Sequence, residues 1–366
     1  MKYGTITFHR AVNFGAVLQT LALQEALKKT GIDSEVIDYR CQFIERHYAP
    51  FRITDVFNLR RVYGIVKANA FSRNNRSKFD EFIRKYIKTS SCIYNTKNDL
   101  LDSNSAYDAF IAGSDQVWSY FCAGFDKAYF LDFVLDKRKK MSYAASFGVD
   151  SIPEEYIQNY EMLLKDFHRI SVREEQGKQI LQDILHVDVP IVLDPTLLLT
   201  RAEWGNYMNP VKHKGEYILV YLMTETEEIL SFARKLSART KYKIIYINDR
   251  FYKRYGMTNV DTLSPSDWLT LVLNAKYMIT NSYHGVAFSI NFNIDFFVEF
   301  LAEPAKVNSR LKNILDIFDL KERLISNMHK ESVLTKIDYA LVNKKLEIER
   351  NSSMQYINGL KRQVEN

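Results

Sequence analysis

Short apolar runs alternate with longer amphipathic segments along this chain of 366 residues, and this alternation constrains the fold more than any other feature. Residues 3–8 have the pattern of a strand, residues 16–29 that of a helix and residues 35–39 that of a second strand. Gly31 lies just past the expected helix, where glycine commonly ends one. A strand–helix–strand unit predicts two parallel strands joined by a right-handed crossover.

The alternation continues in two series. In the first we expect strands at 109–112, 141–145, 170–173 and 190–193, and helices at 153–167 and 174–185. In the second we expect strands at 217–222, 243–247, 276–280 and 296–300, and helices at 225–239, 264–274, 284–291, 309–318 and 338–356. Two such series predict an α/β fold of two Rossmann-like, doubly wound domains facing a cleft. We place them at 1–205 and 206–325, followed by a C-terminal helical tail at 326–366.

Positive charge is concentrated in residues 51–88, which carry ten Lys or Arg against three Asp or Glu. The net charge of this segment is +7, so with +6 for the whole chain the remainder sums to −1. We interpret it as a basic helical insertion in the N-terminal domain. Such a block favours an anionic partner. There are three alternatives: a membrane surface that carries lipid-linked phosphosugars, a nucleic acid, or no partner at all for a solvated insertion. No nucleic-acid-binding motif surrounds it, so we expect no nucleic-acid partner.

Cysteine and histidine usage points to a reducing compartment and away from metal chemistry. Cys41, Cys92 and Cys122 have no paired spacing, which is typical of a cytosolic protein. The seven histidines form no ligand-spaced cluster, so we expect no metal. No apolar run approaches the ~18 residues of a membrane span, and no signal peptide is evident. We expect a cytoplasmic protein, with peripheral contact at the inner face of the membrane as an alternative.

Polar clusters follow two expected strands of the first series. Asn13 and Gly15 precede a helix, where glycine allows close backbone approach and the helix N-terminus attracts anions. Small, acidic, amide and aromatic side chains follow the strand at 109–112: Ser114, Asp115, Gln116 and Trp118. Hydrogen-bonding groups beside an aromatic ring are typical of a sugar site. Apart from Asp115, to which we give a catalytic role, we assign these residues to an acceptor site, with core packing as the alternative for Trp118.

Two further clusters carry groups suited to anions. Arg173 ends the strand at 170–173, and its planar guanidinium matches a carboxylate or a phosphate, although a salt bridge with Glu174 is the alternative. Residues 280–285 read Thr-Asn-Ser-Tyr-His-Gly, and Asn281 or Ser282 can cap the helix that follows. His284 would then lie in the first helical turn, where it can contact a phosphate and exchange a proton.

Six blocks in this order resemble the polysaccharide pyruvyl transferase family over roughly residues 3–325. They are Asn13-Phe14-Gly15-Ala16-Val17-Leu18-Gln19, Gly113-Ser114-Asp115-Gln116-Val117-Trp118, Tyr143-Ala144-Ala145-Ser146-Phe147-Gly148, Ser171-Val172-Arg173-Glu174, Asp194-Pro195-Thr196 and Asn281-Ser282-Tyr283-His284-Gly285. The resemblance implies a GT-B-like fold, phosphoenolpyruvate as donor and a saccharide as acceptor, in bacterial exopolysaccharide or capsule synthesis. It implies that the active-site histidine is His284 and that the arginine on the inner face of the cleft is Arg173.

The sequence departs from the family at Ser282, where many members have an arginine that helps to hold the donor. A serine supplies no charge, so we expect Arg310 to take its place, together with Arg173, Ser282 and Gly285. In the implied reaction His284 is the general acid and Asp115 orients or deprotonates the acceptor hydroxyl. No cofactor is required beyond the donor substrate. The rival hypotheses are a GT-B glycosyltransferase or sugar-nucleotide epimerase, and an inactive sugar-binding homologue.

Overall fold

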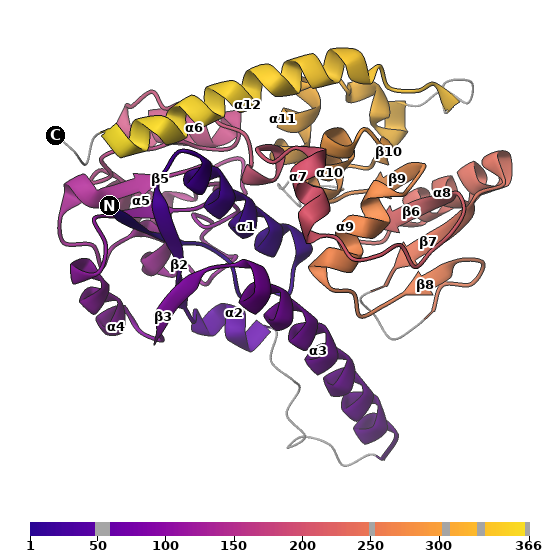
Figure 1. The fold of residues 1–366 in the computed structure, drawn as a ribbon, viewed down its shortest axis with the longest axis horizontal. Helices are drawn as coiled ribbons and strands as arrows, with labels where there is room; N and C mark the ends of the chain where they lie inside the picture. The colour runs from indigo at the N-terminus through magenta and orange to yellow at the C-terminus, as the bar shows by residue number, and fades with distance from the viewer. Residues whose placement is uncertain (48–58, 249–252, 302–307, 328–333, 363–366) are drawn as a thin grey trace.

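A computed structural model describes residues 1–47, 59–248, 253–301, 308–327 and 334–362. Two five-stranded sheets form its framework, and within each sheet every paired strand is parallel to its neighbour (Figure 1). The first sheet has the order β3-β2-β1-β4-β5 and the second the order β10-β9-β6-β7-β8. Helices between the strands complete both, so the predicted α/β class with two doubly wound units is confirmed.

The first sheet and its helices come from the first half of the chain. Its strands are β1 (Lys2–Ile6), β2 (Asp33–Tyr39), β3 (Thr89–Tyr94), β4 (Ala109–Ala112) and β5 (Lys140–Ser142). Its helices are α1 (Phe14–Lys29), α2 (Gln42–His47), α3 (Leu59–Tyr86), α4 (Lys97–Leu101), α5 (Glu154–Leu164) and α6 (Glu175–Leu185). β3 was not predicted, because its sequence Thr-Ser-Ser-Cys-Ile-Tyr has no apolar run.

The second sheet contains β6 (Tyr217–Tyr221), β7 (Lys243–Ile247), β8 (Thr258–Val260), β9 (Tyr277–Thr280) and β10 (Asp295–Val298). The later helices are α7 (Arg201–Trp204), α8 (Glu227–Thr240), α9 (Pro265–Leu273), α10 (Tyr283–Phe292), α11 (Ser309–Ile317) and α12 (Tyr339–Arg362). The three-residue edge strand β8 was not predicted either, because it is polar and only partly buried.

Two predicted strands, at 170–173 and 190–193, are wrong as continuous strands. They contribute only isolated parallel bridges, Ala145 to Val172 and Val172 to Ile191. The cause is local, since two serine hydroxyls replace part of the backbone ladder. Ser142 Oγ accepts from the Ser171 N–H at 3.0 Å, and Ser171 Oγ accepts from the Ala144 N–H at 3.2 Å. The first sheet is therefore extended beyond β5 by irregular chain.

The two units pack together through an apolar interface formed by their helices. Phe14, at the start of α1, stacks on Trp268 of α9 with ring centroids 5.5 Å apart. Trp204 of α7 contacts Phe288 of α10 at 5.1 Å. One hydrophobic cluster includes buried side chains from both sheets, so the two units share a core and are not joined by a linker alone. This packing brings the N-termini of α1 and α10 together beside the carboxyl ends of β1 and β9.

The C-terminal helix α12 returns to the first sheet and runs along one side of the molecule (Figure 1). The Tyr3 hydroxyl donates to Leu360 O at 3.0 Å, and the Tyr356 hydroxyl donates to Ser142 O at 3.0 Å. The Leu193 N–H donates to Ser353 Oγ at 2.9 Å. The predicted C-terminal tail is therefore a helix that packs on the first unit and is hydrogen-bonded to it.

The basic segment includes α3, a helix of 28 residues that projects from the body (Figure 1). Residues 51–58 of the predicted insertion lie outside the described residues. The last turns of α3 bury Phe79, Phe82 and Ile83, and the helix packs against α1 of the first unit and α9 of the second. In the described part of the chain, no helix is long and apolar enough to cross a lipid bilayer.

Candidate active site

A cavity of about 250 Å³ lies where the two units meet. Six residues predicted from the sequence line it: Asn13, Asp115, Gln116, Ser282, His284 and Arg310. The other lining residues are Asn281, considered as a possible helix cap, and seven to which no role had been given: Phe121, Cys122, Met223, Tyr283, Leu301, Asn308 and Leu311. The first unit supplies the carboxylate and two of the four amides, and the second unit supplies the imidazole, the guanidinium and the other two amides.

His284 lies in the first turn of α10. Ser282 caps this helix, with the Gly285 N–H donating to Ser282 Oγ at 3.4 Å. The imidazole Nε2 is fully buried and has no hydrogen-bond partner among the described residues. It lies 3.7 Å from Asp194 Oδ2, which is ion-pair distance but too long for a hydrogen bond. The ring thus has a carboxylate behind it and the cavity in front.

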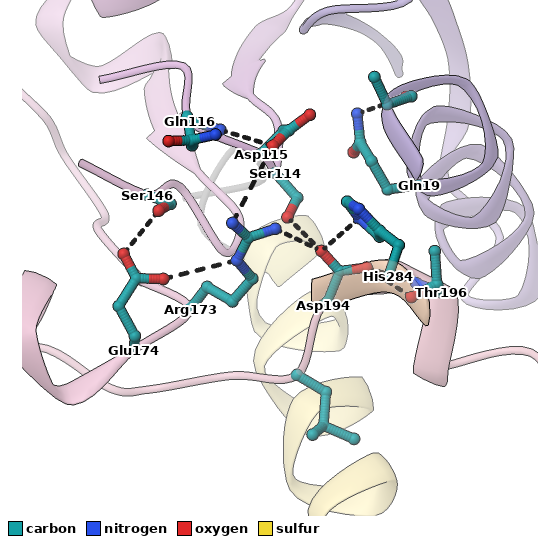
Figure 2. A network of polar contacts seen from close by, with 12 residues as sticks. Gln19, Ser114, Asp115, Gln116, Ser146, Arg173, Glu174, Asp194, Thr196 and His284 are labelled. Carbon is teal, nitrogen blue, oxygen red and sulfur yellow. Dashed lines mark hydrogen bonds and ion pairs between the residues drawn. The ribbon is translucent and has the colours of Figure 1, made fainter. Parts of the chain in front are cut away.

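Asp194 joins the two units in a fully buried polar network (Figure 2). Its Oδ2 pairs with Arg173 Nη1 at 2.8 Å and accepts from Ser114 Oγ at 3.0 Å. Its Oδ1 accepts from the Thr196 N–H at 2.9 Å and from Thr196 Oγ1 at 2.7 Å. Burial alone would raise the pKa of Asp194, but His284, Arg173 and Thr196 outweigh it and hold the pKa well below its ordinary value. Asp194 is therefore an anion at neutral pH.

Arg173 is part of this network and does not line the cavity, which corrects the predicted direct contact with a donor. It is buried beneath the ring of Tyr283, with the guanidinium carbon 4.5 Å from the ring centroid. Burial lowers the pKa of Arg173, but Asp194, Tyr283 and Glu174 together raise it above its usual range. The alternative of a Glu174 contact is also present, at 3.5 Å from Nε. Arg173 therefore balances buried carboxylates from behind the cavity wall.

Arg310 is the cationic side chain that lines the cavity. It lies in the first turn of α11, and its Nε is buried without a hydrogen-bond partner, as is Ser309 Oγ next to it. Asn308 precedes the helix but makes no capping bond, because its side chain bonds to the backbone of Leu301 instead. Burial, followed by the proximity of Arg173, lowers the pKa of Arg310. Such a desolvated cation beside an uncapped helix N-terminus is a strong site for an anion.

Asp115, for which a catalytic role was predicted, has an unusual backbone conformation. Its φ is 75°, in the left-handed region that non-glycine residues rarely adopt. The Gln116 N–H donates to Asp115 Oδ1 at 2.9 Å, and Arg173 Nη2 lies 4.0 Å from the same atom. Strain of this kind persists where the surrounding structure fixes a functional group. The carboxylate is held at the rim of the cavity, opposite Arg310 and His284.

Four predicted contact residues are corrected by their surroundings. Trp118 is 0% exposed and stacks on Phe130 in the core, with Nε1 donating to Tyr129 O at 3.3 Å, so it cannot stack on a sugar. Ser114 is also fully buried, and its hydroxyl donates a hydrogen bond to Asp194. A Cβ on Gly15 would lie 1.9 Å from His284 Nδ1, and a Cβ on Gly285 would lie 2.5 Å from Thr280 Oγ1. Both glycines allow close packing rather than direct ligand contact.

Asn281 was considered only as a cap, yet it organises one wall of the cavity. Its Oδ1 accepts from the Met223 N–H at 2.8 Å, and its Nδ2 donates to Thr224 O at 2.6 Å. In the described ranges, no group of three or more His, Cys, Asp or Glu side chains is arranged to hold a metal ion. The chemistry available here is thus an imidazole backed by a carboxylate, a desolvated guanidinium and a strained aspartate.

Two doubly wound parallel sheets with a polar cavity between them define the GT-B-type class of enzymes. In fold, the chain is similar to a putative UDP-N-acetylglucosamine 2-epimerase from Listeria monocytogenes at 12% identity, with 96% of this chain and 90% of that chain covered and a TM-score of 0.52. It also matches the UDP-GlcNAc 2-epimerase from Neisseria meningitidis (8% identity, 97% and 100% covered, TM-score 0.49). A third match is MurG from Acinetobacter baumannii (11% identity, 98% of both chains, TM-score 0.45).

The family is shown by the sequence itself. The model of the polysaccharide pyruvyl transferase family matches residues 13–298, and the chain belongs to this family. The match begins after β1 and covers the other strands of both sheets, together with both helices whose N-termini meet at the cavity. No curated protein sequence matches the chain. The protein is therefore a transferase of polysaccharide modification, built on a GT-B-type fold.

Proposed function

We propose that this protein transfers a pyruvyl group from phosphoenolpyruvate to hydroxyls of a saccharide and forms a pyruvate ketal. The observation that carries the proposal is Arg310 Nε, a buried guanidinium donor without a hydrogen-bond partner in the described structure, on a residue that lines the same cavity as His284. Unpaired buried donors are costly, and a bound anion satisfies them. Phosphoenolpyruvate carries a carboxylate and a phosphate on one enol carbon, so one small ligand can meet both His284 and Arg310.

The residues divide the chemistry among them. Arg310 and the N-terminus of α11 hold the anionic groups, and Ser282 leaves room beside them without adding charge. His284 delivers a proton to the methylene carbon of the donor, while Asp115 takes the proton of the acceptor hydroxyl as its oxygen bonds to the central carbon. The carbon–oxygen bond to phosphate then breaks. A second hydroxyl adds at the same carbon, its proton leaves with the released phosphate, and the ketal ring closes.

The cavity at His284 measures about 250 Å³, below the roughly 300–1,000 Å³ of pockets that hold drug-sized ligands, and this size suits a small donor such as phosphoenolpyruvate. A GT-B glycosyltransferase or epimerase activity has the fold in its favour, since the Listeria protein shares it. Thermal shift with phosphoenolpyruvate, UDP-GlcNAc and UDP separates these candidates.

The decisive experiment incubates the enzyme with phosphoenolpyruvate and extracted lipid-linked oligosaccharides, and follows phosphate release and product mass. Wild type should release phosphate only with acceptor present, which also excludes an inactive sugar-binding protein. Loss of a general acid typically costs 10²–10⁴-fold in rate, so His284→Ala should lose at least about a hundredfold in kcat. Arg310→Gln should chiefly raise the KM for phosphoenolpyruvate. Full turnover by His284→Ala would refute the assignment.

A further inference from the structure

A second cavity, of about 350 Å³, adjoins the first on the side of the first unit. The two share a wall formed by Asn13, Asp115, Gln116, Phe121 and Cys122. Beyond this wall the second cavity is lined mainly by apolar side chains, with Phe43 of α2 at its far side. A ligand there would lie next to anything bound at His284, with Asp115 between the two.

Two phenylalanine side chains in this cavity are exposed, whereas the other phenylalanines whose burial the structure describes are buried or partly buried. Phe43 is 48% exposed and Phe121 is 43% exposed. Among the phenylalanines whose burial the structure describes, these are the exposed ones, and both line this one cavity. A single exposed apolar residue needs no explanation, but a pair converging on one cavity marks a binding surface.

The Phe43 ring is held in place rather than left to move. Gly124 has a φ of +63°, and a Cβ at this position would lie 2.8 Å from Phe43 Cδ2, so the ring packs directly on glycine backbone. Its helix is tied to α3 by the ion pair of Glu45 with Arg76 at 2.7 Å, and Ile44 beside it is buried. A rigid exposed ring binds a ligand at little cost in conformational entropy.

We infer that the second cavity is the acceptor subsite, in which Phe43 and Phe121 pack on the C–H faces of a sugar ring. Pyranose rings present an apolar C–H face and a rim of hydroxyls, which matches aromatic rings flanked by the amides of Asn13 and Gln116. The hydroxyl nearest Asp115 would then face the donor cavity. This inference rests on the proposed function, and it gives the stacking role to these two rings instead of the buried Trp118.

Saturation-transfer NMR on the full-length protein tests the subsite without donor. The probes are the methyl β-glycosides of galactose, glucose, mannose and N-acetylglucosamine. At least one should bind the wild type, and Phe43→Ala combined with Phe121→Ala should raise its Kd at least tenfold. Phe43→Tyr and Phe121→Tyr should retain binding, because a phenol keeps the flat face. Tyr255→Ala, at a ring that is 95% exposed elsewhere, is the matched control and should change nothing.

The same variants separate this inference from the proposed function. Thermal shift with phosphoenolpyruvate should be unchanged by Phe43→Ala, because Phe43 lines only the second cavity and Arg310 and His284 remain. Saccharide binding that depends on the two rings, with no response of the wild type to phosphoenolpyruvate, would support the subsite and overturn the donor. Equal binding by wild type and the double alanine variant, or no binding of any probe to wild type, would overturn the subsite.

Discussion

Asp194 is the residue on which the arrangement of the site depends most directly. It pairs with Arg173 from the first unit at 2.8 Å and faces His284 from the second at 3.7 Å. Ser114 and Thr196 occupy its remaining acceptor positions. The carboxylate therefore lies behind the imidazole, as an aspartate does behind a catalytic histidine.

Asp194→Asn should destabilise the protein and slow the transfer reaction. The change leaves Arg173 buried without its closest counter-ion, and breaking a buried pair in this way typically costs about 3–5 kcal/mol. Urea unfolding at pH 7 measures the loss, and kcat measured on the folded variant should fall because His284 loses its carboxylate. Asp188→Asn is the control, since Asp188 pairs with Lys178 on the surface and should leave stability close to that of wild type.

The pH dependence follows from the depressed pKa of Asp194. A carboxyl whose folded pKa is below its unfolded pKa adds stability that is complete above the unfolded value and is lost as pH falls through the folded value. The stability difference between wild type and Asp194→Asn should therefore be constant above about pH 5 and shrink below the ordinary carboxyl pKa of 3.8. A difference that stays constant down to pH 3 would show that Asp194 is not charged in the folded protein.

A contact between two helices decides how His284 is placed. The first turns of α1 and α10 touch, and Gly15 permits the contact because a Cβ there would lie 1.9 Å from His284 Nδ1. Gly15 would therefore affect the reaction only by allowing this close packing. The sequence Asn-Phe-Gly at the start of a helix is equally typical of an ordinary capped helix, so the contact of Gly15 with His284 could not be predicted before the fold was known.

Gly15→Ala should displace the His284 ring or part the two helices. Overpacking of this kind costs about 1–3 kcal/mol, and a shift of about 1 Å in a catalytic group can cost 10²-fold in rate. We expect a modest fall in Tm and a fall of about a hundredfold in kcat/KM. Gly205→Ala is the matched control, because nothing lies within 4 Å of its added Cβ. Wild-type kcat/KM in Gly15→Ala would contradict the role of this contact.

At the scale of the whole molecule, the basic helix α3 is the feature that the active site does not use. Arg76 is paired with Glu45 and belongs to the structure, whereas Arg73 and Arg84 are exposed. A projecting basic helix suits an anionic membrane surface, where the lipid-linked acceptor of the proposed reaction would be found. Membrane contact of this kind is a proposal that follows from charge and shape.

Arg73→Gln combined with Arg84→Gln should weaken binding to vesicles that contain phosphatidylserine. Each basic residue near an anionic surface contributes about 1 kcal/mol, so the pair should lower the partition coefficient roughly tenfold to thirtyfold in sedimentation. Lys235→Gln with Lys241→Gln removes the same charge from α8 and its C-cap, and should have little effect. Equal losses in both double variants would assign the binding to net charge alone.

The sequence by itself determined the framework and the main chemical groups. The periodicity of apolar residues predicted two parallel α/β units, because burial on both faces of a parallel strand and one face of a helix leaves a readable pattern. Polar residues at strand ends led to His284, Asp115, Gln116 and Asn13. Arg310 was proposed to replace the arginine that many family members have at the position of Ser282. All five line the cavity. Periodicity was too weak for the polar strands β3 and β8.

Only the tertiary structure decided which of these groups meet and which are buried. Asp194 caps the turn at Thr196, so locally it looks like any capping aspartate, and its partners Arg173 and His284 are far away in sequence. Trp118 and Phe121 are three residues apart, yet one is in the core and the other is exposed. Exposure and long-range pairing depend on how distant segments pack in three dimensions, and local sequence patterns do not record that packing.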